Sequence, residues 1–308
     1  MTPSFLFAAA AAVFSIGITA SAALLPSSQV ATLSKYMQFS AAVYCNVVNS
    51  QGTWTCGTDC QGATAGTTVA KTFKNGDTGT GVVAIQPSSK SIIVIFRGSS
   101  TPGDWAKNLD FGLDAATWIQ ASWAAPRNLG SRLTGARLAI PSGLKVHGGF
   151  QDVYLGVRTT VQNTIADLLA QNPGFSVYFT GHSLGGALAS LAAIDYLDLH
   201  GTSNAANTFL YTYGQPRTGN DVWANWVSTL PFGSISRVTK KNDPVPHLPP
   251  ESFSYRHFKQ EYGINASGQS VSCTNTGDAG EVSDCMNDNF EWWKFDVNAH
   301  TNGYYFPS

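Results

Sequence analysis

Hydrophobic residues follow two alternating patterns along this 308-residue chain. Short, almost continuously apolar runs such as residues 91–96 (SIIVIF) are typical of strands buried on both faces of a parallel sheet. Longer segments between them repeat apolar residues at helical spacing, as in residues 152–172, where Asn172-Pro173-Gly174 predicts the end of a helix. This alternation predicts an α/β fold with a mostly parallel central sheet flanked by helices.

The same patterns predict the remaining elements. We expect helices at residues 28–44 and 187–199, and strands at 175–180, 208–213 and 234–239. Residues 52–80 are rich in Gly, Thr and Ser and predict loops and hairpins, whereas residues 99–144 predict a long irregular connection. Neither a repeat nor a linker divides the chain, so we expect one domain from residue 23 to 308.

The first 22 residues are expected to be a signal peptide. Residues 5–18 form an apolar run that is too short for a comfortable membrane span, and Ala20-Ser21-Ala22 has the small-residue pattern of a cleavage site. No other run approaches membrane length. The sequence therefore predicts a secreted protein without a transmembrane segment.

Cysteine usage agrees with an oxidising compartment. The simplest pairing joins Cys56 to Cys60 and Cys273 to Cys285, since no histidine lies at zinc-ligand spacing beside either pair. Cys45 is left over, as a buried thiol or as a link to another chain. Asn265-Ala266-Ser267 is a glycosylation sequon, which fits a surface loop of a secreted protein.

Overall charge argues against one class of partner. Only 12% of residues are charged and the net charge is −1, so a nucleic-acid binder is not expected. Aromatic residues also make up 12%, which fits apolar ligands and an ordinary core equally well.

Candidate chemistry begins at Gly181-His182-Ser183-Leu184-Gly185. This Gly-x-Ser-x-Gly pattern is weak by itself, but here it lies between an apolar strand and a helix rich in small residues, as a nucleophile elbow requires. The turn is so sharp that side chains at positions 181 and 185 would collide with their surroundings. We therefore predict Ser183 as a nucleophile at the start of a helix.

A serine nucleophile needs a histidine base, which follows it in the chain order of α/β hydrolases. His147 precedes Ser183, His182 is expected only to pack, and a cationic role at the helix end explains His200. His300, in a loop-like segment near the terminus, fits best, with His247 and His257 as alternatives.

The base needs an orienting carboxylate after a strand. Asp243 follows the strand expected at residues 234–239 and fits best. Weaker rivals are Asp221, Asp278 and Asp284.

Four ordered motifs carry a family resemblance. Residues 146–150 (VHGGF), 181–186 (GHSLGG), 213–220 (YGQPRTGN) and 242–250 (NDPVPHLPP) resemble the fungal class 3 lipases, the family of filamentous-fungal triacylglycerol lipases and feruloyl esterase A. The resemblance extends from about residue 30 to 305. It implies the α/β-hydrolase fold, a triad of Ser183, Asp243 and His300, oxyanion donors at Ser99 and Leu184, and a supporting role for His147.

The resemblance also implies a lid over the site. It falls on residues 100–111, with Trp105, Leu109 and Phe111 as its apolar side chains, and it is more polar than a typical lid. The segment 112–146 that follows is longer than in typical members and predicts either a flap over the substrate groove or a satellite core, built from Trp118, Ile119, Trp123, Leu129, Leu138 and Ile140. Family lipases often join a cysteine near position 45 to one beyond the catalytic histidine, and this chain has none there.

These features predict a secreted carboxylic ester hydrolase, a triacylglycerol lipase that acts as a monomer without metal or organic cofactor. We expect its partner to be a lipid or ester substrate, which includes substrate at an oil–water interface. The alternative with the same triad is a feruloyl or short-chain carboxylesterase. Two further hypotheses are a binding protein on an inactive hydrolase scaffold and a segment 112–146 that docks onto lipid or wall polymer.

Overall fold

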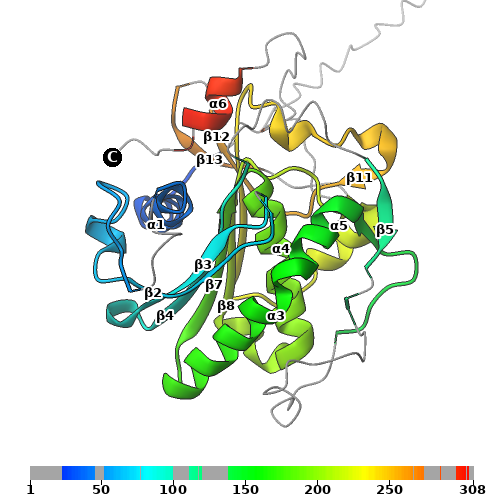
Figure 1. The fold of residues 1–308 in the computed structure, drawn as a ribbon. Helices are drawn as coiled ribbons and strands as arrows, with labels where there is room; N and C mark the ends of the chain where they lie inside the picture. The colour runs from blue at the N-terminus through cyan, green and yellow to red at the C-terminus, as the bar shows by residue number, and fades with distance from the viewer. Residues whose placement is uncertain are drawn as a thin grey trace, which may run out of the picture.

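A nine-stranded sheet forms the centre of the molecule in the computed structural model, which describes residues 23–45, 52–76, 78–99, 111–116, 118–119, 138–265, 267–273, 285, 296–302 and 304 (Figure 1). The strand order is β1-β13-β12-β10-β8-β7-β4-β3-β2. Its strands are β1 (Ala23–Leu24), β2 (Thr68–Phe73), β3 (Gly81–Gln86), β4 (Ser91–Phe96), β7 (Ser176–His182), β8 (Thr208–Tyr213), β10 (Ser234–Lys240), β12 (Glu261–Ile264) and β13 (Ser270–Ser272).

The sheet is parallel only in its middle. Strands β4, β7, β8, β10 and β12 are parallel to one another, whereas β2, β3, β13 and β1 add antiparallel edges. The α/β-hydrolase expectation is thus confirmed. The prediction of a mostly parallel sheet holds for the centre, where long crossover connections, most of them containing a helix, join successive strands in parallel.

Helices cover both faces of the sheet. The long helices α3 (Gly148–Gln171) and α4 (Leu184–His200) lie on one face, and α1 (Ser27–Ala42) lies on the other (Figure 1). Strand β4 shows why both faces need cover, since Ile92, Val94 and Phe96 belong to one hydrophobic core and Ile93 and Ile95 to the other. The prediction of a strand buried on both faces is confirmed.

A second, four-stranded sheet of order β11-β9-β6-β5 lies beside the main body. It consists of β5 (Leu113–Ala115), β6 (Lys145–His147), β9 (Gly219–Asn220) and β11 (Tyr255–Arg256), next to α5 (Asp221–Val227). Residues 99–144 were predicted as irregular, and the described part departs from this at β5, which pairs with β6. Among the described residues, the remaining helix is α6 (Val297–Asn302), and the short 3₁₀ turns are Gly62–Thr64, Pro87–Ser89, Thr202–Asn207, Val245–His247 and Glu251–Phe253.

Two element boundaries differ from expectation for identifiable reasons. Helix α3 begins four residues before the predicted start, because the His147 side chain accepts a hydrogen bond from the Phe150 amide and caps the helix earlier. His300 lies in α6 rather than in a loop, since Asp296 bonds the amide of Asn298 and begins a helical turn.

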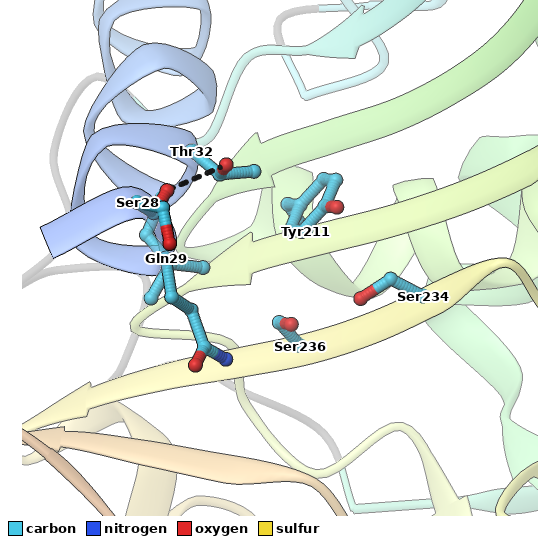
Figure 2. A pocket seen from close by; sticks show the side chains of 7 residues that line it. Ser28, Gln29, Thr32, Tyr211, Ser234 and Ser236 are labelled. Carbon is cyan, nitrogen blue, oxygen red and sulfur yellow. Dashed lines mark hydrogen bonds between the residues drawn. The ribbon is translucent and has the colours of Figure 1, made fainter. Parts of the chain in front are cut away.

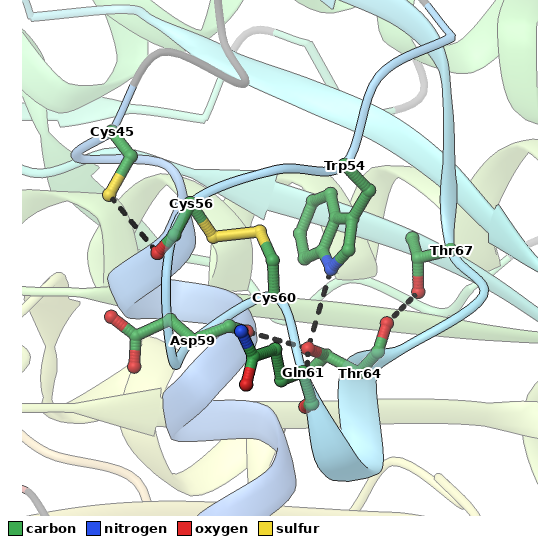
Figure 3. The surroundings of a disulfide bond; sticks show 8 residues. All are labelled: Cys45, Trp54, Cys56, Asp59, Cys60, Gln61, Thr64 and Thr67. Atoms are coloured by element: carbon green, nitrogen blue, oxygen red, sulfur yellow. Dashed lines mark hydrogen bonds between the residues drawn. A yellow bond between two sulfur atoms is a disulfide. The ribbon is translucent and has the colours of Figure 1, made fainter.

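Both predicted disulfides, Cys56–Cys60 and Cys273–Cys285, are present. Figure 3 shows the first beside the end of α1, where the Cys45 thiol points to the Cys56 carbonyl at 3.9 Å. Cys45 is free and half-buried, and burial together with the negative charge of Asp59 raises the pKa of its thiol. A less acidic thiol holds less thiolate and therefore attacks disulfides more slowly.

Among the described residues, none of the helices is long and apolar enough to cross a bilayer. The predicted signal peptide, residues 1–22, lies outside the described residues.

Candidate active site

Ser183 stands on a sharp turn between β7 and α4. Its backbone has φ 61° and ψ −135°, a conformation that costs a residue with a side chain of the order of 1–3 kcal/mol. A Cβ added to Gly181 would lie 2.3 Å from the Gly185 carbonyl carbon, and one added to Gly185 would lie 2.2 Å from the Phe96 oxygen. The predicted collision at both glycines is therefore confirmed, and the turn has the geometry of a nucleophile elbow.

Asp243 and His300 meet at the carboxyl end of the parallel strands, the same end at which Ser183 follows β7 and Asp243 follows β10. Nδ1 of His300 lies 2.9 Å from Oδ2 of Asp243, and both side chains are almost completely buried. The other oxygen, Oδ1, accepts a hydrogen bond from the Val245 amide at 2.8 Å. Tyr304 donates its hydroxyl hydrogen to Oδ2 at 2.5 Å. The carboxylate is thus fixed by three donors.

These contacts determine where the proton of His300 lies. An ionised carboxylate can only accept, so Nδ1 of His300 carries hydrogen and Nε2 presents a lone pair. In the described part of the chain, this Nε2 and the Ser183 Oγ are both buried without a hydrogen-bond partner. A serine hydroxyl and a basic imidazole nitrogen form the pair that base-assisted nucleophiles use.

Gly214 is a site residue that sequence reasoning missed. It has φ 55°, and an added Cβ would lie 3.0 Å from Oδ2 of Asp243 and from Nδ1 of His300. Only a residue without a side chain lets the His–Asp pair lie this close to the end of β8. Its position in the YGQPRTGN motif was the available signal. Tyr304, four residues after His300, was missed as well.

Ser99 and Leu184 flank the nucleophile. A Cβ added to Gly98 would lie 2.9 Å from the Ser183 Cβ, so the loop after β4 touches the elbow, and Ser99 is the next residue. Leu184 is the first residue of α4, where backbone N–H groups have no acceptor within the helix. Both residues are buried. The structure therefore brings the two predicted oxyanion residues to the same side chain.

The histidines set aside from the sequence have other surroundings. His182 was expected only to pack, but its ring hydrogen-bonds to Tyr44 and to the backbone of His300. His200 was expected to be a cationic helix end, and this prediction is wrong because burial lowers its pKa to about 4. His200 is instead a neutral ring stacked on Tyr196.

The alternative acid and base residues lie elsewhere. His257 has its Nε2 2.8 Å from the Pro246 carbonyl, and Asp221 begins α5 on the surface. Asp278 and Asp284 lie outside the described residues. In the described part of the chain, the one group of possible metal ligands contains Cys273 and Cys285, whose sulfurs are joined in a disulfide and so cannot act as thiolate ligands.

The predicted lid is described only at its end, since Trp105 and Leu109 lie outside the described residues. The Phe111 ring lies edge-on to Phe253 at 4.9 Å, and Phe253 is 51% exposed. In the segment 112–146, Trp118, Ile119 and Leu138 belong to the main hydrophobic core and Ile140 packs against it. The described side chains of that segment are therefore structural, whereas Trp123 and Leu129 lie outside the described residues.

A polar pocket of about 280 Å³ lies away from this constellation. Figure 2 shows it between the start of α1 and strands β8 and β10, lined by Ser28, Gln29, Thr32, Leu33, Tyr211, Ser234 and Ser236. Ser234 begins β10, whereas Asp243 follows its end. The pocket is therefore at the opposite end of the strand from the His–Asp pair.

The fold, the strained serine and the buried His–Asp pair define an α/β hydrolase. The family model "Lipase (class 3)" matches residues 93–253, about half of the chain, and the chain belongs to that family. The resemblance inferred from the four motifs is confirmed.

Two relatives and one solved structure place the chain within the family. It is 35% identical to a lipase of Rhizomucor miehei, over 85% of this chain and 65% of that protein. It is 34% identical to "secreted mono- and diacylglycerol lipase 1" of Fusarium solani, over 75% and 62%. A triacylglycerol lipase structure described as having a serine protease triad at its catalytic centre matches with a TM-score of 0.73 and 34% identity, over 90% and 94%. The chain thus spans slightly less than two thirds of the length of the two curated relatives.

Proposed function

We propose that this protein hydrolyses carboxylic esters of glycerol, with triacylglycerols as its main substrates, through Ser183, His300 and Asp243. The observation that carries the proposal is the buried His300–Asp243 hydrogen bond beside a serine held at φ 61°. Burial and strain of this kind are costly, and they concentrate at catalytic sites.

The reaction follows from the proton positions. Nε2 of His300 removes the Ser183 proton as Oγ attacks the ester carbonyl, and Asp243 stabilises the imidazolium that forms. His300 then gives this proton to the departing alcohol, leaving an acyl-enzyme. Water repeats the sequence and releases the acid.

Negative charge on the carbonyl oxygen needs donors. We assign them to the backbone N–H groups of Ser99, which follows Gly98 in the loop that touches Ser183, and of Leu184, which follows Ser183 in the chain. Each such donor is worth about 10²–10³ in rate in other hydrolases. The start of α4 adds the positive end of a helix dipole.

The substrate class rests on the named relatives and on apolar side chains near the site. The relatives reported above are named as lipases, which favours glycerides over feruloyl esters. Phe111 and the exposed Phe253 present aromatic surface at the end of the proposed lid. Such a surface fits acyl chains or a lipid interface.

Export is part of the proposal. Two disulfides, the proposed signal peptide at residues 1–22 and the name "secreted" of the Fusarium relative support a secreted protein. Asn265 lies at a surface turn between β12 and β13 and is the proposed glycosylation site. Its test is the intact mass of the secreted protein before and after endoglycosidase treatment, with Asn265→Gln as the control.

The test of the substrate compares emulsified triacylglycerol with methyl ferulate, using one preparation and Ser183→Ala as the blank. We expect faster turnover of the glyceride and none with Ser183→Ala. Faster cleavage of ferulate would replace the lipase proposal with the esterase alternative. A preference for mono- and diacylglycerols would narrow the substrate to partial glycerides.

A further inference from the structure

His182, the last residue of β7, forms hydrogen bonds with both nitrogens of its ring. Its Nδ1 lies 3.1 Å from the Tyr44 hydroxyl, and its Nε2 lies 2.9 Å from the backbone oxygen of His300. The side chain is 5% exposed. The residue immediately before the nucleophile is therefore bonded to the backbone of the base.

Tyr44 extends the connection to the loop of Ser99. The hydroxyl of Tyr44, just beyond the end of α1, accepts a hydrogen bond from the Gly98 amide at 3.1 Å. Any side chain at Gly98 would strike this hydroxyl, since an added Cβ would lie 2.4 Å from it. The loop that carries Ser99 is thus connected to the ring of His182 through the Tyr44 hydroxyl.

Only one proton arrangement satisfies this chain of bonds. A backbone N–H can only donate and a carbonyl can only accept. The Tyr44 oxygen therefore accepts from Gly98 and gives its hydrogen to Nδ1 of His182, whereas Nε2 carries hydrogen and donates to His300. The ring must be neutral for this, and burial, followed by the electrostatic influence of His300, lowers the pKa of His182 well below its ordinary value.

We propose that His182 is a positioning residue for ester hydrolysis, which holds the His300 backbone and the Ser99 loop in a fixed relation to Ser183. This inference rests on the proposed function. Asp243 fixes the rotation of the His300 imidazole, but the backbone of α6 sets the direction of the His300 Cβ. This helix has only six residues. The His182 bond is a tether for that short helix, and small displacements of a base are costly in rate, up to about 10²-fold.

The first test compares a variant of His182 that lacks polar side-chain atoms with one that keeps them. His182→Phe removes the donor and the acceptor, whereas His182→Gln can keep one of each. On a soluble short-chain ester we expect His182→Phe to lower kcat about 10-fold to 100-fold with little change in KM. His182→Gln should recover most of this loss. A residue with only a packing role would favour Phe over Gln.

A second variant keeps the inference testable if His182→Phe does not fold. Tyr44 is 40% exposed, so Tyr44→Phe removes one hydroxyl without opening the core, and it should also lower kcat. The matched control is Ser40→Ala, one helical turn earlier, because it removes a hydroxyl hydrogen bond of 2.9 Å between α1 and Thr180 of the same strand β7. The control should lower the melting temperature but leave kcat unchanged.

Combining the variants tests whether Tyr44 and His182 act together through their hydrogen bonds. The double variant Tyr44→Phe/His182→Phe should be no slower than His182→Phe, because residues that act together are not additive. All rates are measured well below the melting temperature of every variant. Unchanged kcat in both Tyr44→Phe and His182→Phe, with active wild-type protein, would overturn this inference alone. An inactive wild-type protein would instead overturn the proposed function.

Discussion

Replacing Asp243 with Asn probes the proton logic of the site with the smallest change in shape. Asn offers one acceptor atom and one NH₂ group where Asp243 offers two acceptors. The Val245 amide, 2.8 Å from Oδ1, can only donate, so the amide oxygen of Asn must occupy that position. Its NH₂ group then faces Nδ1 of His300, which must become an acceptor.

This orientation of the Asn side chain changes which nitrogen of His300 carries hydrogen. His300 is forced into the tautomer with hydrogen on Nε2, and that nitrogen can no longer take the Ser183 proton. The same exchange in a serine protease lowers kcat about 10⁴-fold, which corresponds to about 5 kcal/mol of transition-state stabilisation. We expect a loss of that size in Asp243→Asn, measured as kcat on a soluble ester.

The matched control is Asp221→Asn, at the exposed start of α5. It makes the same chemical change away from the site and should keep wild-type kcat. Circular dichroism would show that both variants are folded. If folded Asp243→Asn kept more than about a tenth of the wild-type kcat, the assignment of Asp243 as the orienting acid would be wrong.

Three further predictions concern the elbow and the fold. Gly185→Ala places a Cβ 2.2 Å from a strand carbonyl, so soluble yield and esterase activity should collapse, and an active variant would contradict the elbow geometry. His200 has a pKa of about 4 in the folded protein and about 6.5 when unfolded, so its contribution to the free energy of unfolding is full above pH 6.5 and is lost as the pH falls towards 4. His200→Phe should therefore lose less stability in urea between these pH values than the wild type does, by about 3 kcal/mol at most. Equal losses of stability in the two proteins would contradict this. Arg158→Met leaves the buried Asp195 without its cation and should lower the free energy of unfolding by about 3–5 kcal/mol. Arg256→Met breaks a solvent-exposed ion pair with Glu251 and should lower it by less than about 1 kcal/mol. Similar losses in urea unfolding would show that burial does not determine the effect.

Elements with strong periodicity could be predicted from the sequence. Strand β8 was expected at the residues where it lies, and β4 likewise, because their apolar runs are bounded by polar turns. The antiparallel strands at the edges of the sheet were harder to predict from the sequence. Strand β3 was not predicted, although it pairs antiparallel with its sequence neighbours β2 and β4 and is almost fully buried.

The candidate site was predicted through its motifs and missed in its supporting contacts. Ser183, Asp243 and His300 were placed by chain order and local setting, and the His300–Asp243 contact is present. Sequence alone did not reveal that Tyr304 bonds Asp243, because the pattern does not show where a hydroxyl points. His182 was interpreted as a packing residue for the same reason.

Labelling with a fluorophosphonate shows directly whether Ser183 is an activated nucleophile. The reagent forms a covalent bond with a serine only when a base and an oxyanion site activate it. We predict a single adduct, mapped by peptide mass spectrometry to Ser183, that is absent from Ser183→Ala and from protein unfolded before labelling. A folded protein that forms no adduct at Ser183 would contradict the assignment of Ser183 as the nucleophile and favour a binding protein on an inactive hydrolase scaffold.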